Sequence, residues 1–96
     1  MAPYIMRIQV TVPSMLTHAV GDTRHVWIEA GTLSELMGKL QTQFPLLRPL
    51  VWDDQLKVRK HVMIFLNDQS LAWLPEGEIV LKEHDELSIV QAVSGG

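Results

Sequence analysis

Hydrophobic and polar residues alternate along several stretches of the chain, and this period of two predicts half-buried strands. In the first stretch Met6, Ile8, Val10 and Val12 share one face, and Pro13 ends the run. The pattern predicts strands over the ranges 6–12, 25–30, 61–66, 79–81 and 87–93, of which 79–81 is short.

One amphipathic helix is predicted between the second and third strands. Thr32 and Glu35 have the spacing of a capping box, in which each residue satisfies a backbone N–H at the start of a helix. Apolar residues then follow at helical spacing as far as Phe44. Pro45 ends the helix, because proline disfavours helical geometry in the residue before it.

The remaining stretches are expected to be connections. Residues 46–52 are apolar, but Pro49 interrupts them, so we predict a packed loop rather than a strand. Residues 68–78 contain Pro75 and Gly77 and are also predicted to form a loop. The order of elements is therefore strand, strand, helix, strand, short strand, strand, which indicates an α+β fold.

One face of the predicted sheet stays open to water, because a single helix covers only the other face. Met63 and Phe65 alternate with core residues and so point away from the helix, as do Trp27 and Val90 on other strands. Large apolar side chains on an open face often mark protein interfaces, so Trp27, Met63 and Phe65 form a candidate partner interface. The alternative is that Trp73 and its loop fold over them.

Composition narrows the classes of function. The chain has 96 residues, of which 47% are hydrophobic, so we expect one globular domain over residues 1–96. Its net charge of −3 argues against nucleic-acid binding, which requires a basic surface. No apolar run reaches membrane-spanning length and no signal peptide is recognisable, so we expect no membrane association and a cytoplasmic location.

Acidic residues are concentrated before the final strand. Five of the eleven, which are Glu76, Glu78, Glu83, Asp85 and Glu86, lie in this stretch. Such a run usually forms a solvated face. A second interpretation is an acidic collar that guides the end of the chain into a basic partner.

No active site is recognisable in the sequence. The four histidines are scattered, without the spacing of metal ligands, and no phosphate-binding loop or nucleophile motif is present. We therefore expect no catalytic residue, no bound metal and no bound cofactor. The chain has no cysteine, which excludes disulfides and any transport of sulfur on a thiol side chain.

The sequence ends in Gly95-Gly96, directly after the final predicted strand. Glycine lacks Cβ, so this pair can enter a slot that is too narrow for any other residue. A glycyl carboxylate is also unhindered, which suits an acyl group that is activated and then attacked. The alternative is a frayed end without a function.

Several segments together resemble the MoaD/ThiS sulfur-carrier family. The strongest similarity follows residue 61 and comprises residues 62–68, 85–89 and 92–96. The helix-opening segment 30–36 and the stop at Phe44-Pro45 are similar to the same proteins. The resemblance extends over nearly the whole chain.

The resemblance implies a ubiquitin-like β-grasp, a mixed sheet of about five strands wrapped around one main helix, with the first and last strands central. It implies that Gly96, preceded by Gly95, is adenylated by a ubiquitin-activating-type adenylyltransferase that uses ATP and magnesium. The glycine then becomes a thiocarboxylate, which donates sulfur to a sulfur-accepting synthase of the molybdopterin, thiamine or cysteine type. The open sheet face is where such carriers meet their enzymes.

Three segments depart from the family pattern. Residues 17–21 lack the arginine and paired glycines of molybdopterin-type members, residues 83–85 lack the usual central glycine, and residues 51–60 are atypical. These departures leave the pathway open. The alternatives are a ubiquitin-like modifier joined through Gly96 to lysines, an obligate small subunit of a molybdopterin-synthase-like complex, and a binding module with an inert tail.

Overall fold

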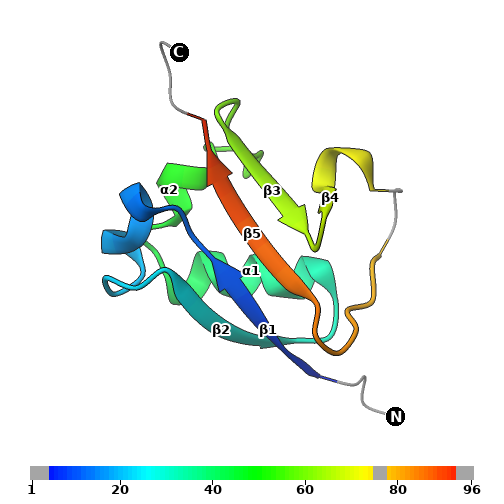
Figure 1. Ribbon diagram of the computed structural model, residues 1–96. Coiled ribbons are helices and arrows are strands. Elements are labelled where there is room, and N and C mark those ends of the chain that lie inside the picture. Colours follow the sequence, from blue (N-terminus) through cyan, green and yellow to red (C-terminus); the bar gives the residue numbers. More distant parts are fainter. Residues whose placement is uncertain (1–4, 75–77, 93–96) are drawn as a thin grey trace.

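The computed structural model describes residues 5–74 and 78–92 (Figure 1). The strands are β1 (Met6–Thr11), β2 (His25–Ala30), β3 (Val62–Leu66), β4 (Gln69–Ser70) and β5 (Glu86–Gln91). The α-helices are α1 (Leu33–Gln43) and α2 (Arg48–Val51). Two 3-10 helices complete the elements, η1 (Ser14–Ala19) and η2 (Leu71–Trp73).

The strands form one mixed sheet in the order β2-β1-β5-β3-β4. β1 and β5 are parallel neighbours at its centre, and the other neighbouring strands are antiparallel. Helix α1 lies across the far face of the sheet in Figure 1, and within the described ranges no helix crosses the near face. This is the expected α+β architecture, a β-grasp with its first and last strands at the centre.

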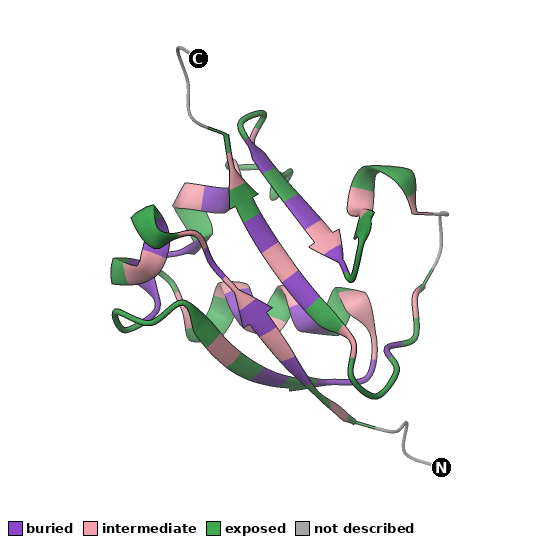
Figure 2. Cartoon of the chain, in the orientation of Figure 1, coloured by how far each residue is buried: buried purple, intermediate pink, exposed green. Residues whose placement is uncertain are grey.

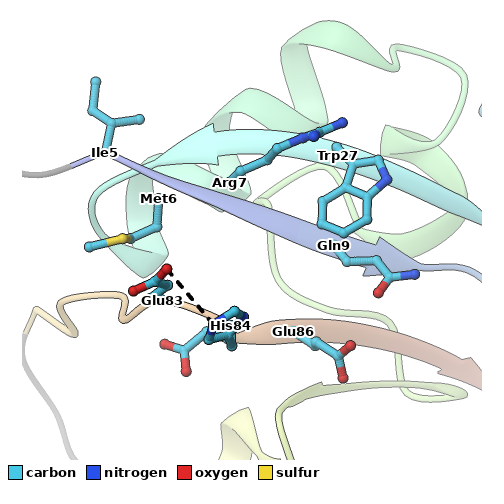
Figure 3. A pocket seen from close by; sticks show the side chains of 9 residues that line it. Ile5, Met6, Arg7, Gln9, Trp27, Glu83, His84 and Glu86 are labelled. Carbon is cyan, nitrogen blue, oxygen red and sulfur yellow. Dashed lines mark ion pairs between the residues drawn. The ribbon is translucent and has the colours of Figure 1, made fainter.

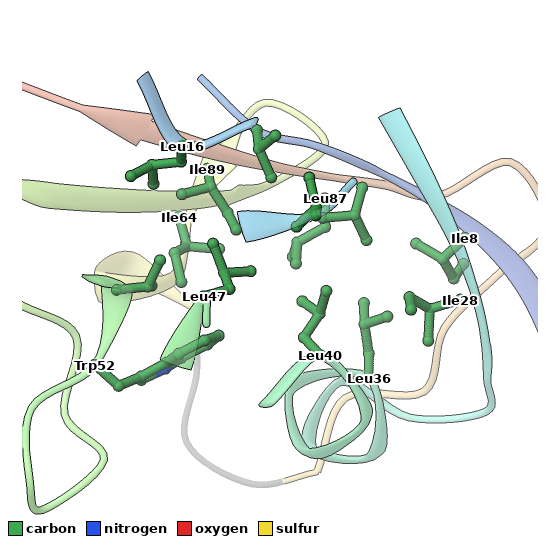
Figure 4. Packing of buried hydrophobic residues seen from close by; sticks show 14 of the residues in the cluster. Ile8, Leu16, Ile28, Leu36, Leu40, Leu47, Trp52, Ile64, Leu87 and Ile89 are labelled. Carbon is green, nitrogen blue, oxygen red and sulfur yellow. The ribbon is translucent and has the colours of Figure 1, made fainter. Parts of the chain in front are cut away.

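The hydrophobic core fills the space between α1 and the covered face of the sheet (Figures 2 and 4). Leu36 and Leu40 on α1 are fully buried, as are Ile8 on β1 and Leu87 on β5. Full burial of such a side chain contributes about 1.5–3 kcal/mol, so these contacts decide which face of each strand turns inward. Along β3 the burial alternates as expected, and Met63 is exposed between two buried residues.

The start of α1 has the capping box that the sequence predicts. The backbone N–H of Glu35 donates to the Thr32 hydroxyl at 3.2 Å, and the Glu35 carboxylate accepts from the N–H of Gly31 at 2.6 Å. These bonds satisfy donors that have no partner inside the helix. The helix ends at Gln43, before Phe44 and Pro45, as expected.

Two expected connections contain regular structure, so these predictions were wrong. Residues 46–52 include α2, because Pro49 lies in its first turn, where the missing N–H costs no helical hydrogen bond. Residues 69–70 form β4, which pairs with the end of β3. A two-residue strand is too short to show an alternating pattern in the sequence.

The prediction of a short strand at 79–81 was also wrong. These residues are described, and they make a single bridge between Val80 and Thr32. The N–H of Leu33 donates to the carbonyl of Ile79 at 2.9 Å, and the N–H of Leu81 donates to the carbonyl of Gly31 at 2.9 Å. The segment is thus attached to the start of α1 rather than to the sheet.

The final strand is close to its expected position. It begins at Glu86, one residue early, and ends at Gln91, whereas Val93 lies outside the described residues. No helix within residues 5–74 and 78–92 is long and apolar enough to cross a membrane.

Candidate functional site

The C-terminal end of β5 is the part of the sheet from which the last residues of the chain follow. β5 ends at Gln91, and the N–H of Ala92 then donates to the carbonyl of His61 at 2.8 Å, beside the start of β3. The candidate residues Gly95 and Gly96 lie outside the described residues. The described part of the site is therefore the surface around this end of β5, which we call the tail end.

Two exposed apolar side chains stand together at the tail end. Met63 on β3 is the cross-strand partner of Val90 on β5, and they are 47% and 44% exposed. Side chains at directly opposite positions on one face lie about 5 Å apart between their Cβ atoms, so the two form one apolar patch. Phe65 lies on the same face of β3 and is half-buried between Ser70 and Ser88.

Trp27 does not belong to this patch. It lies on β2 opposite Gln9 of β1, and Gln9 is in turn opposite Glu86 at the beginning of β5. Both central strands therefore separate Trp27 from Met63, a distance of about 14 Å across the sheet at the usual strand spacing. The indole is 50% exposed, as expected, and is separate from the contact between Met63 and Val90. That Trp27, Met63 and Phe65 contact one partner stays a prediction.

Polar side chains occupy the part of the open face between Trp27 and the pair of Met63 and Val90. Gln9 Nε2 donates to His25 Nδ1 at 2.9 Å, and the Thr11 hydroxyl lies 3.1 Å from the same nitrogen. Ser88 continues this row on β5, opposite Thr11. The open face thus consists of two apolar sites with a hydrogen-bonded polar strip between them.

Trp73 flanks the open face instead of covering it. Its side chain is 80% exposed on η2, and Met63 beside it remains exposed. A hollow of about 480 Å³ separates η2 from β3 and is lined by residues that include Val58, Met63, Leu71 and Trp73. Sequence reasoning missed Val58 and Leu71, because neither lies in an alternating or helical pattern that indicates exposure.

The loop beside the tail end carries exposed cations. Lys57 and Lys60 are both exposed in it. The N–H groups of Lys57 and Gln55 donate to the Asp53 carboxylate at 3.0 and 2.8 Å and hold the pKa of Asp53 below its ordinary value. The carboxylate therefore stays ionised and fixes the loop on which the lysines stand.

The acidic stretch lies at the opposite end of β5. Glu83 and Asp85 immediately precede β5, and Glu86 is its first residue. A strand of this length extends for about 20 Å. These carboxylates are therefore remote from Ala92, which contradicts the placement that an acidic collar around the tail requires.

The described residues bring no metal-ligand cluster together. Within residues 5–74 and 78–92, no group of three or more histidine, aspartate or glutamate side chains is placed to hold a metal ion. The features that distinguish this surface are instead an apolar patch and a strand that leads to the final residues.

The parallel central strands and the packing of helix α1 on one face of the sheet define a ubiquitin-like β-grasp protein. The sequence matches the model of the ThiS family over residues 10–96, so the chain belongs to the ThiS family. This confirms the resemblance to the MoaD/ThiS sulfur carriers. No protein of curated function matches the sequence.

Solved structures of the same fold come from bacteria, archaea and eukaryotes. A chain of the Amycolatopsis orientalis BexX/CysO complex is 21% identical with a TM-score of 0.77, over 93% of this chain and 99% of that one. SAMP1 of Haloferax volcanii is 20% identical with a TM-score of 0.74, over 94% and 99% of the two chains. Urm1 of Trypanosoma brucei is 16% identical with a TM-score of 0.70, over 99% and 100%.

Proposed function

We propose that this protein is a sulfur carrier that is activated at the carboxylate of Gly96. The single observation that carries the proposal is the match to the ThiS family, which continues through residue 96 and so includes Gly95 and Gly96. The chain acts as a co-substrate of its partner enzymes and contributes no catalytic group of its own. The domain supplies recognition, and the last residues supply the reacting atom.

The proposed chemistry has two steps. A ubiquitin-activating-type adenylyltransferase holds ATP and magnesium, and the Gly96 carboxylate attacks the α-phosphorus of ATP, so that pyrophosphate leaves. Hydrosulfide then attacks the carbonyl carbon of the acyl adenylate and forms the C–S bond of the thiocarboxylate, and AMP leaves with one of the former carboxylate oxygens. Because an acyl adenylate hydrolyses readily, the reaction requires a closed pocket in the partner. The thiocarboxylate then donates its sulfur to a synthase of the molybdopterin, thiamine or cysteine type.

The tail-end patch is the proposed contact with the activating enzyme. Met63 and Val90 stand on rigid strands close to Ala92, so an enzyme that binds this pair receives the residues after Ala92 in a defined place. Phe65 extends the same face along β3, beside Ser88 of β5. Apolar side chains of this size on a fixed backbone lose little freedom when they are buried in a complex. A chain of the same fold occurs in a complex with BexX, which supports a partner-binding role for this architecture.

A second candidate function is protein modification. SAMP1, which has the same fold, is a small archaeal modifier protein, and its similarity to this chain supports a modifier joined through Gly96 to lysines of other proteins. A third is an obligate small subunit of a molybdopterin-synthase-like complex. These functions use the same terminal glycine but differ in what attacks it.

The mass of the intact protein from its native host tests the proposal. We expect a fraction in which one oxygen is replaced by sulfur, located at the C-terminus by fragmentation. Growth with and without a sulfur source is the matched control, and the sulfur-containing fraction should fall without it. Lysine-linked conjugates alone, under sulfur-replete conditions, would establish the modifier function instead.

A substitution at the last residue tests the activation step. We expect Gly96→Ala to abolish ATP–pyrophosphate exchange by the cognate adenylyltransferase, because a methyl group does not fit a slot built for glycine. Thermal melts should match those of the parent protein, since the substituted residue follows the final strand. Exchange at the parent rate would disprove the narrow-slot argument.

A further inference from the structure

A hollow of about 440 Å³ lies at the opposite end of the open face from Ala92 (Figure 3). Its walls come from the start of β1, from Trp27 on β2, and from the turn that precedes β5. Because β1 and β5 are parallel, both strands begin at this end and run toward the tail end. The hollow is therefore about one strand length away from Ala92.

The hollow combines an aromatic surface with an excess of negative charge. The Arg7 guanidinium carbon lies 4.6 Å from the centre of the Trp27 ring, so the cation covers part of the indole. The half-exposed indole still presents apolar area. The lining contains the carboxylates of Glu83, Asp85 and Glu86 against the one positive charge of Arg7.

Two of these carboxylates are available for a ligand. Asp85 is used internally, because its carboxylate accepts the Lys82 N–H at 2.7 Å and the Asn67 side-chain amide at 3.0 Å. Glu83 has a single contact among the described residues, a 3.8 Å approach to the exposed ring of His84. For the Glu86 carboxylate, the described part of the chain provides no hydrogen bond or ion pair.

The turn that carries the acids is held rigidly. The side-chain oxygen of Asn67 accepts a hydrogen bond from the Glu86 N–H at 3.0 Å. The backbone N–H of Asn67 donates to the Glu86 carbonyl at 2.7 Å. The N–H of Asp85 closes the turn on the Lys82 carbonyl at 3.1 Å. These bonds fix the backbone of the turn, so the turn itself loses little conformational entropy when a ligand binds.

His84 occupies the third position of this turn. Its φ of 72° lies in the left-handed region, where glycine is normally preferred, and Asp22, Leu56 and Asn67 adopt the same region elsewhere in the chain. The exposed imidazole lines the hollow beside Glu83.

We infer that this hollow is a docking site for a basic segment of a partner protein. The segment inserts an arginine or lysine side chain whose charge lies between the carboxylates of Glu83 and Glu86. The aliphatic part of that side chain packs on the exposed part of the Trp27 indole. Charge complementarity selects this occupant, since an anionic lipid surface or a nucleic acid would be repelled. The inference goes beyond the chemistry of Gly96 and does not depend on it.

Titration of the isotopically labelled full chain, followed by nuclear magnetic resonance, tests the inference. The probe is an acetylated and amidated pentapeptide in which two arginines flank a leucine and a glycine stands at each end. The matched probe replaces both arginines by citrulline, which has nearly the same shape and no charge. We expect saturable shifts at Arg7, Trp27 and His84 with the arginine peptide, and at least tenfold weaker binding of the citrulline peptide.

A pair of double variants separates the site from the overall charge. Glu83→Gln with Glu86→Gln should weaken binding of the arginine peptide at least fivefold. Asp22→Asn with Asp54→Asn removes the same charge from two exposed turns elsewhere and should change binding less than twofold. Equal losses in both double variants would overturn the inference, because binding would then depend on net charge alone.

Three other outcomes would also overturn it. The first is shifts centred on Met63 and Val90 rather than on Trp27. The second is the absence of saturable shifts at millimolar peptide. The third is the appearance of the same shifts on concentrating the protein without peptide, which would make a second copy of this chain the occupant.

Discussion

The two ends of β5 present opposite kinds of surface. At the tail end, the apolar pair Met63 and Val90 stands beside a loop with exposed lysines. At the other end, a fixed acidic turn faces Trp27 across a hollow. The same strand thus connects a surface suited to presenting the final residues with a surface suited to binding a basic group.

The difference follows from the topology of the sheet. The parallel pairing of β1 with β5 places the starts of both strands at one end and their ends at the other. The antiparallel strands β2 and β3 lie on opposite sides of this central pair, so their open-face residues never meet. A protein built in this way presents two separate surfaces on one face of its sheet, and the predictions below test that separation.

The largest expected effect distinguishes the two faces of β3. Ile64→Ala should lower the free energy of unfolding by about 2–5 kcal/mol, because Ile64 is 3% exposed and its truncation leaves a cavity in the core. Met63→Ala, one residue away on the open face, should change it by less than about 0.5 kcal/mol. Chemical denaturation measures both values. Equal losses of unfolding free energy in the two variants would show that Met63 packs in a core as Ile64 does.

The next effect tests whether the open-face residues of β3 form the interface with the activating enzyme. Phe65→Ala should weaken the complex with the activating enzyme at least tenfold, which corresponds to about 1.4 kcal/mol. Its thermal stability should change little, since Phe65 lies outside the core and is half-exposed. Titration calorimetry measures the affinity.

Trp27→Ala is the matched control for that experiment. It removes a larger aromatic side chain from the same face of the sheet, on the other side of the two central strands. If the two surfaces are separate, this variant should bind the activating enzyme with the parent affinity and lose affinity for the arginine peptide. A tenfold loss of affinity for the activating enzyme in Trp27→Ala would show that both surfaces belong to one interface.

Most of the fold was predictable from local patterns. Alternation placed β1, β2, β3 and β5 within about two residues of their observed bounds, because one face of each strand is buried. The capping box of Thr32 and Glu35 marked the start of α1. The errors fell where local pattern is ambiguous, since Pro49 interrupts a strand but is accommodated in the first turn of α2.

The site was less predictable than the fold. Alternation correctly assigned Trp27, Met63 and Val90 to the open face. It contains no information on the order of strands in the sheet, so it could not show that both central strands lie between Trp27 and Met63. The acidic collar failed for a different reason, because the final strand separates Glu83, Asp85 and Glu86 from the tail by about 20 Å.

The smallest expected effect concerns the strained turn at the acidic end. His84 adopts a left-handed conformation, which costs a residue other than glycine about 1–2 kcal/mol. Glycine would avoid this cost, but it makes the unfolded chain more flexible, which offsets about 0.4–1 kcal/mol. His84→Gly should therefore raise the free energy of unfolding by about 0.5–1 kcal/mol in chemical denaturation.

Asn67→Gly is the matched control, because Asn67 has a φ of 57° and also lies in the left-handed region. Its side chain makes two hydrogen bonds to the acidic turn, and glycine would lose both, so this variant should be less stable than the parent. His84→Gly should bind the arginine peptide more weakly in spite of its greater stability, because the imidazole lines the hollow. If the His84→Gly protein is less stable than the parent, the turn is not strained. If its affinity for the arginine peptide is unchanged, the imidazole does not contribute to the docking site.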